Sequence, residues 1–138
     1  MDSPGALAPG GQTMLSAIEG PDTGPVSGRD ENAMILVSVM YPGGADAQPF
    51  DLAYYLEHHM PLVRERWSAM GLEKAEVVKA SGTPDGSPAP FQVMALLTFR
   101  SLEDFQKAGA AHGKEIFGDI PNFFKGQPVV QVNEPQSF

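Results

Sequence analysis

Residues 54–63, YYLEHHMPLV, place two tyrosines, a glutamate and two histidines within ten positions. Histidine changes its charge near neutral pH, so an imidazole beside a bound molecule can give or take a proton. Successive residues of a helix turn by about 100°, which puts Tyr55 and His59 on the inward face and leaves Tyr54 and His58 at its margin or in solvent. We therefore predict that His59 is a general base or acid and that Tyr55 assists it. The simpler alternative is that both are core side chains with satisfied polar atoms.

A second group of polar residues lies in HGKEIFGDIPNFF, residues 112–124. His112 falls at the edge of the apolar face of a predicted helix, and Asp119 and Asn122 occupy the turn that follows it. Loops at helix ends often carry functional side chains. We expect Asp119 to orient or polarise a histidine, and Asn122 or Tyr55 to hydrogen-bond an oxyanion. The alternative is a local helix stop, made by a glycine and a Pro-Asn turn.

The elements that must position these residues are short apolar strands and two helices. Asp51 stands at the N-cap of the first helix, Gly71 stands where that helix should stop, and Ser101 precedes the second helix in a pattern like a capping box. Turn-rich segments separate the strands. The predicted strands are 33–41, 73–80, 91–99 and 127–134, and the predicted helices are 52–70 and a segment that starts at 102.

Pro61 interrupts the first predicted helix. It cannot donate a hydrogen bond to the carbonyl of Glu57, and it should push Met60 away from helical angles. We therefore expect the helix to kink or restart beside His59, which would widen the space over the sheet. The predicted inward face consists of Leu52, Tyr55, Leu56, His59, Val63, Arg66 and Met70.

The order strand, helix, strand, strand, helix, strand predicts an α+β fold, a ferredoxin-like βαββαβ unit with a four-stranded antiparallel sheet. Its helices would cover one face of the sheet only. The strands at 33–41 and 91–99 are apolar on both sides, so the second face also needs cover. The simplest cover is the same face of another subunit, and we expect a homodimer formed through the sheet faces.

Composition places bounds on the chain. With 138 residues, 42% of them hydrophobic, it should hold a single domain, 33–138, after a flexible tail, 1–32, rich in Gly, Pro, Ser and Asp. The formal charge of −8 and the scattered Lys and Arg residues argue against binding to nucleic acid. No apolar run approaches the roughly 18 residues of a membrane span. The absence of cysteine suits a reducing, cytoplasmic location.

Three stretches carry a resemblance to a known family: MILVSVMYPGG, FDLAYYLEHHMPLV and DIPNFFKGQPVVQVNE. They resemble the EthD family, named after an accessory protein of ethyl tert-butyl ether degradation, over about residues 34–134. The resemblance implies a dimeric α+β barrel in which each subunit keeps a small pocket between helices and sheet, lined by His59. Proteins of this architecture include muconolactone isomerases and cofactor-independent monooxygenases, and the family itself has no established reaction.

The leading hypothesis is a small cofactor-independent oxidoreductase, monooxygenase or isomerase that acts on a hydrophobic, oxygen-bearing small molecule. His59 would move the proton, with Tyr55 and Asp119 assisting. The side chains expected to contact the substrate are His112, Asn122, Trp67 and Phe99. A competing hypothesis is a non-catalytic accessory protein that holds the same ligand. A third takes His59, His112 and Asp119 as an iron site, although no ligand spacing supports it, and we expect neither metal nor cofactor.

Overall fold

Four antiparallel strands form one sheet in the spatial order β2-β3-β1-β4 in the computed structural model, which describes residues 33–138. The strands are β1 (Ile35–Pro42), β2 (Leu72–Lys79), β3 (Phe91–Phe99) and β4 (Val129–Asn133). The predicted ferredoxin-like βαββαβ fold is therefore confirmed. The tail predicted for residues 1–32 lies outside the described residues.

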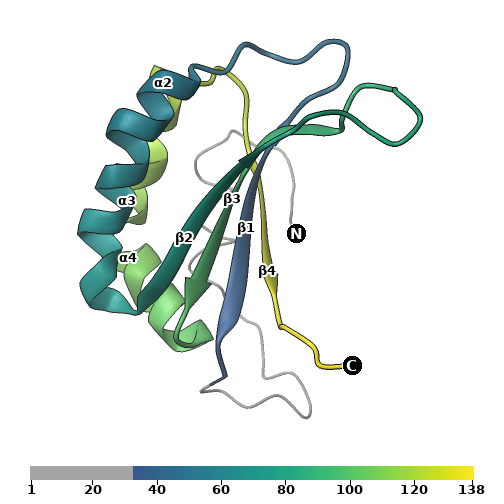
Figure 1. Cartoon of the computed structure of the whole chain (residues 1–138). Coiled ribbons are helices and arrows are strands. Elements are labelled where there is room, and N and C mark those ends of the chain that lie inside the picture. The colour runs from purple at the N-terminus through teal and green to yellow at the C-terminus, as the bar shows by residue number, and fades with distance from the viewer. Residues whose placement is uncertain (1–32) are drawn as a thin grey trace, which may run out of the picture.

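Two helical segments lie against the same face of this sheet (Figure 1). The first follows β1 and consists of α2 (Leu52–Tyr54), a π-helical turn (Tyr55–His59), α3 (Met60–Trp67) and a 3-10 turn (Ser68–Met70). The second follows β3 and consists of α4 (Leu102–Gly118) and a 3-10 turn (Ile120–Asn122). All the functional candidates lie on these two segments or on the strands beneath them.

The core lies between the helices and the sheet. On β1, Val37, Val39 and Tyr41 point toward the helices and are buried, and they pair with Leu97, Ala95 and Val93 of β3. Alternate residues of a strand face opposite sides, so each strand contributes every second side chain to this layer. Burial of each large apolar side chain in such a layer stabilises the fold by about 1.5–3 kcal/mol.

No helix within residues 33–138 covers the opposite face of the sheet (Figure 1). That face carries apolar side chains as the sequence predicts: Leu36 and Met40 of β1 and Met94 and Leu96 of β3 are half-buried. The edge strands add Val78 and Val129, each 45% exposed. A row of apolar residues on a face without helices is typical of a surface that meets another protein.

The helix boundaries follow local capping chemistry. Asp51 accepts a hydrogen bond from the Tyr54 amide at 3.1 Å, and Ser101 accepts one from the Asp104 amide at 3.1 Å, so each side chain satisfies an amide that the first turn leaves free. Gly71 ends the first helical segment with a φ of 106°, in the left-handed region. All three residues act as their sequence positions predict.

The π-helical turn corrects one part of our expectation about Pro61, the angles at Met60, whereas the predicted restart beside His59 is observed, since α3 begins at Met60. Met60 keeps helical angles (φ −67°, ψ −37°), and its amide donates to the carbonyl of Tyr55, five residues back. The chain thus accommodates the missing N–H of Pro61 by one wide turn, after which a new helix begins, and it does not kink at Met60. Because the wide turn holds one more residue, the adjacent His59 and Met60 are both buried, whereas Leu56, which we predicted to face inward, is 47% exposed.

Candidate active site

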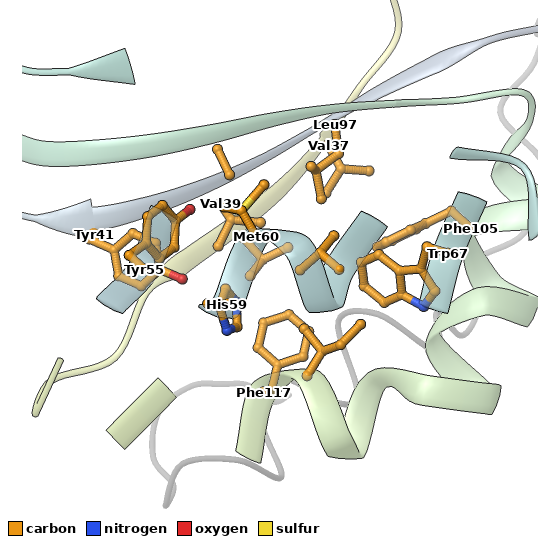
Figure 2. A pocket seen from close by; sticks show the side chains of 14 residues that line it. Val37, Val39, Tyr41, Tyr55, His59, Met60, Trp67, Leu97, Phe105 and Phe117 are labelled. Carbon is orange, nitrogen blue, oxygen red and sulfur yellow. The ribbon is translucent and has the colours of Figure 1, made fainter. Parts of the chain in front are cut away.

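A cavity lies between the helical layer and β1, β3 and β4, at the level of the π-helical turn (Figure 2). The space left empty between its walls, its open mouth included, is about 380 Å³. The enclosed cavity itself measures only about 20 Å³, so a bound molecule would have to displace flexible wall residues such as Met60. The lining residues are Val37, Val39, Tyr41, Tyr55, His59, Met60, Val63, Trp67, Ala95, Leu97, Phe105, Ile116, Phe117 and Val130.

His59 lines the cavity and also forms a hydrogen bond with a carboxylate. Its Nδ1 atom lies 3.0 Å from Oδ2 of Asp119, and the two side chains are 5% and 15% exposed. A carboxylate can only accept, so Nδ1 carries the hydrogen and donates it when the imidazole is neutral. That tautomer leaves Nε2 with a free lone pair, and Nε2 makes no hydrogen bond to any residue in 33–138. An imidazole held in this way can accept a proton at Nε2.

The protonation states of the pair follow from burial and hydrogen bonding. Burial lowers the pKa of His59, and the hydrogen bond and charge of Asp119 oppose that shift without reversing it. Burial alone would raise the pKa of Asp119, but hydrogen bonds from Asn122, Tyr54 and His59 outweigh it and leave the pKa below its usual value. Near neutral pH the pair therefore consists of a neutral imidazole and a carboxylate.

Asp119 is itself held by two further side chains. The Tyr54 hydroxyl donates to Oδ1 of Asp119 at 2.7 Å, and Nδ2 of Asn122 donates to the same oxygen at 2.8 Å and to the Tyr54 hydroxyl at 3.3 Å. The hydrogen bond to Asp119 raises the pKa of Tyr54, which keeps the phenol protonated as a donor. One carboxylate oxygen is thus fixed, and the other is left for His59.

The backbone that carries Asp119 is tied to the start of the first helical segment. Asp119 ends α4, and the 3-10 turn that follows returns the chain so that the Phe123 carbonyl accepts from the Asp51 amide at 2.9 Å. Phe50 and Phe124 form an isolated antiparallel bridge beside it. These contacts bring together polar residues that lie 60 positions apart in the sequence.

Tyr55 contributes a second chemical group to the cavity. Its side chain is fully buried and stacks on His59, with ring centroids 5.4 Å apart and an interplanar angle of 14°. Burial raises its pKa, so the hydroxyl stays protonated; the nearby Tyr41 opposes that shift. The Tyr55 hydroxyl forms no hydrogen bond that meets distance and angle criteria with any residue in 33–138, although the Tyr41 hydroxyl lies close enough to affect its pKa. It is a free donor inside an apolar space.

The other residues named from the sequence divide into two groups. Trp67 lines the cavity at the end far from Tyr55 and donates its indole N–H to the Ala108 carbonyl at 2.9 Å. Phe99 is buried against Trp67, with centroids 5.6 Å apart, but does not line the cavity. His112, on α4, is half-buried and also lies outside the lining, as does the exposed Asn122, whose partners are Asp119 and Tyr54.

The iron-site alternative has no ligand set in residues 33–138, where no three His, Asp or Glu side chains converge closely enough to hold a metal ion. In that same part of the chain, no helix is both long enough and apolar enough to cross a bilayer.

Tyr54 is the site residue that our sequence analysis did not select. We placed it at the margin of the inward face, and it is half-buried there, but its long side chain reaches the carboxylate on the other helical segment. The only signal in the sequence was the pair of adjacent tyrosines in front of the histidines. A margin position is where a tyrosine can keep its ring against apolar neighbours and its hydroxyl on a polar partner.

Comparison with known proteins identifies relatives of this sequence and fold. The family model described as the EthD domain matches residues 46–127. An EthD-like protein from Ralstonia eutropha is 38% identical, with a TM-score of 0.67 over 75% of this chain and 92% of that one. An ethyl tert-butyl ether degradation (EthD) family protein from Bacillus halodurans is 22% identical, with a TM-score of 0.54 over 75% and 99%.

A third solved structure, a Shewanella loihica protein provisionally named a monooxygenase, is 14% identical with a TM-score of 0.51 over 77% and 97%, and it shows the fold alone. No curated protein sequence matched. The family model covers more than half of the chain, including His59, Tyr55 and Asp119. The resemblance seen in the sequence is confirmed: the chain belongs to the EthD family.

Proposed function

We propose that this protein catalyses proton transfer on a small hydrophobic, oxygen-bearing molecule bound in the cavity, with His59 as general base. The observation that carries the proposal is the hydrogen bond between His59 and Asp119 at a cavity wall. A buried histidine and carboxylate are costly to keep away from water unless they pair, and a perturbed pair in a cavity is a candidate site. The free donor on Tyr55 stands beside this base.

In the proposed reaction, Nε2 of neutral His59 takes a proton from a carbon next to a carbonyl, or from a phenol. The electron pair of the broken bond moves onto the substrate oxygen, which becomes an enolate or phenolate. The Tyr55 hydroxyl donates to that oxygen, and Asp119 stabilises the imidazolium that forms through Nδ1. Three residues from two helical segments thus share the charge that develops.

The enolate has two onward routes. In an isomerase, His59 returns the proton to a different carbon of the same molecule. In a monooxygenase, the carbanion gives its electron pair to dioxygen and forms a carbon–oxygen bond, and the peroxide takes the proton from the imidazolium. Loss of water from this hydroperoxide, with the second hydrogen of the same carbon, leaves a new carbonyl and carries away the other oxygen atom. Both routes begin with the same proton removal, so that step is the one to test first.

The test follows exchange of carbon-bound hydrogen for deuterium in D₂O, measured by NMR on a panel of aryl ketones and hydroxyquinones. We expect the wild-type protein to accelerate exchange for members of the panel and His59→Gln to lose at least about a hundredfold of that acceleration. The matched control is His58→Gln, because His58 is the adjacent histidine, is exposed and does not line the cavity. Equal exchange by wild type and a folded His59→Gln protein would overturn the assignment.

A second candidate function is that of a non-catalytic accessory protein that stores or transfers the same ligand. The narrow, almost wholly apolar cavity favours it, because most of the lining serves to bind and only His59 and Tyr55 offer chemistry. Saturable binding of panel members, with neither exchange nor product under air between pH 6 and 9, would support this function over catalysis.

We also propose that two copies pack through the sheet faces that carry no helices. Leu36, Met40, Met94 and Leu96 form an apolar row there, and a contact between identical faces would bury it symmetrically. This arrangement supports the cavity indirectly, because β1 and β3 also form its floor.

A further inference from the structure

The cavity lining holds no permanently charged group, and its one base, His59, is neutral near neutral pH because burial lowers its pKa. The lining contains no Lys, Arg, Asp or Glu, and its polar members are two tyrosines, one histidine and one tryptophan. The nearest formal charge on the hydrogen-bond network is the carboxylate of Asp119, which is negative. A carboxylate or phosphate placed here would lose its hydration, would lie near the negative Asp119, and would gain a cation only if His59 took up a proton against its lowered pKa.

The hydrogen-bonding groups of the wall leave one unused donor that is fully enclosed. The indole N–H of Trp67 is satisfied by the Ala108 carbonyl, and Nδ1 of His59 is satisfied by Asp119. Of the two tyrosine hydroxyls in the lining, that of Tyr55 is fully buried and forms no hydrogen bond that meets geometric criteria within residues 33–138, although the Tyr41 hydroxyl lies near it. An orphaned buried hydroxyl costs about 1–3 kcal/mol, a cost that a ligand oxygen would remove on binding.

These groups are not spread evenly over the cavity. Figure 2 shows the hydroxyls of Tyr41 and Tyr55 at one end and the rings of Trp67 and Phe105 at the other. The rings of Trp67 and Phe105 contact each other edge-on, with centroids 6.2 Å apart. The cavity therefore has a hydrogen-bonding end and an aromatic end, with His59 between them (Figure 2).

We infer that the ligand is an uncharged, largely apolar molecule with one acceptor oxygen, which lies against Tyr55 while the apolar part extends toward Trp67 and Phe105. This inference rests on the proposed use of the cavity as a binding site. It adds a charge state, a required functional group and an orientation. It does not depend on whether His59 then removes a proton.

The experiment compares three molecules of nearly equal shape: acetophenone, isopropylbenzene and benzoate. The first has an acceptor oxygen, the second has none, and the third has a negative charge. A second series, with the same three groups on naphthalene, tests whether the cavity accepts a larger ring system. Dissociation constants are measured by ligand-observed NMR on the full-length wild-type protein and on Tyr55→Phe, which keeps the ring that stacks on His59.

In at least one series we expect the ketone to bind about tenfold more tightly than the hydrocarbon, as one buried hydrogen bond would give, and the carboxylate to bind more weakly than both. Tyr55→Phe should remove the preference for the ketone and leave hydrocarbon affinity within about twofold. The inference would be overturned if the wild-type protein favours the carboxylate, does not distinguish ketone from hydrocarbon, or binds neither series at millimolar concentration. A preference that persists in Tyr55→Phe would overturn it as well.

The same ketones separate this inference from the proposed reaction, because their α-hydrogens report exchange in D₂O. Ketone preference without exchange would support the ligand class and count against His59 as a base. Exchange that depends on His59, with no preference for the ketone in binding, would support the reaction and overturn the ligand class.

Discussion

Replacement of Asp119 by asparagine should reverse the tautomer of His59 while the fold is preserved. In the native site, Oδ1 of Asp119 accepts from Tyr54 and Asn122 at 2.7 and 2.8 Å, and Oδ2 accepts from Nδ1 of His59 at 3.0 Å. An asparagine has a single oxygen. If that oxygen stays with Tyr54 and Asn122, the amide NH₂ faces His59 and requires Nδ1 to be an acceptor.

The hydrogen-bond count decides between the two orientations of the asparagine. With its oxygen toward Tyr54 and Asn122, the asparagine at position 119 keeps the hydrogen bonds from both residues and adds one from its NH₂ to Nδ1 of His59. With its oxygen toward His59, the asparagine keeps the native tautomer of His59, but its NH₂ then faces the NH₂ of Asn122, and two donors cannot hydrogen-bond to each other. The difference is at least one hydrogen bond, about 1 kcal/mol, which corresponds to roughly a fivefold preference for the orientation that reverses the tautomer.

The assay is two-bond ¹H–¹⁵N NMR of protein labelled in its histidines, which distinguishes a protonated from an unprotonated ring nitrogen. We expect wild-type His59 to show hydrogen on Nδ1 and the Asp119→Asn protein to show it mainly on Nε2. His58 and His112 serve as internal references because they lie outside this network. A His59 ring that keeps hydrogen on Nδ1 in a folded variant would refute the reasoning, and with it the role of Asp119 in keeping Nε2 basic.

Three further predictions follow from burial and packing. Burial keeps the pKa of His59 below its ordinary 6.5, so the contribution of His59 to the free energy of unfolding is complete above that pH and is lost as pH falls toward the pKa of the folded state. The free energy of unfolding, measured in urea, should therefore be lower at pH 5.5 than at pH 7.5, and His59→Gln should lack this decrease. Tyr55→Phe removes a buried hydroxyl without a described partner, so the free energy of unfolding should rise by ~1 kcal/mol, and a fall of that size would mean that the hydroxyl is satisfied. Wild-type protein should sediment as a dimer at low micromolar concentration and Leu96→Glu as a monomer, whereas a soluble wild-type monomer would contradict the pairing of sheet faces.

The fold could be predicted because its boundaries depend on local chemistry. Asp51 and Ser101 cap helices with their own side chains, and Gly71 stops one by adopting a φ that other residues avoid. Each of these signals extends over three or four residues, so it can be read from a short stretch. The alternation in β1 and β3 is equally local, since every second residue faces the same side.

The site could be predicted only in part because it depends on contacts between distant segments. The sequence indicated that Asp119 would orient a histidine, but the choice of partner depends on how α4 docks beside the first helical segment. Tyr54 was missed because rotation by 100° per residue assumes a regular helix and ignores the reach of a long side chain. The exposure of Leu56 has the same origin, since the π-helical turn changes the rotation within the segment.

The π-helical turn also makes the composition of the cavity wall depend on the number of residues in this helical segment. A one-residue deletion between Tyr55 and Met60 would convert the wide turn into an ordinary one, and helix formation would remain possible on both sides. The helical residues on either side would keep their phase, because the wide turn holds one residue more than an ordinary turn. An ordinary turn cannot bury two adjacent side chains on the same face, however, so either the imidazole of His59 or the side chain of Met60 would leave the cavity wall. When relatives are aligned, a one-residue gap at this point would therefore mark a protein that keeps the architecture but has lost one of these two wall positions.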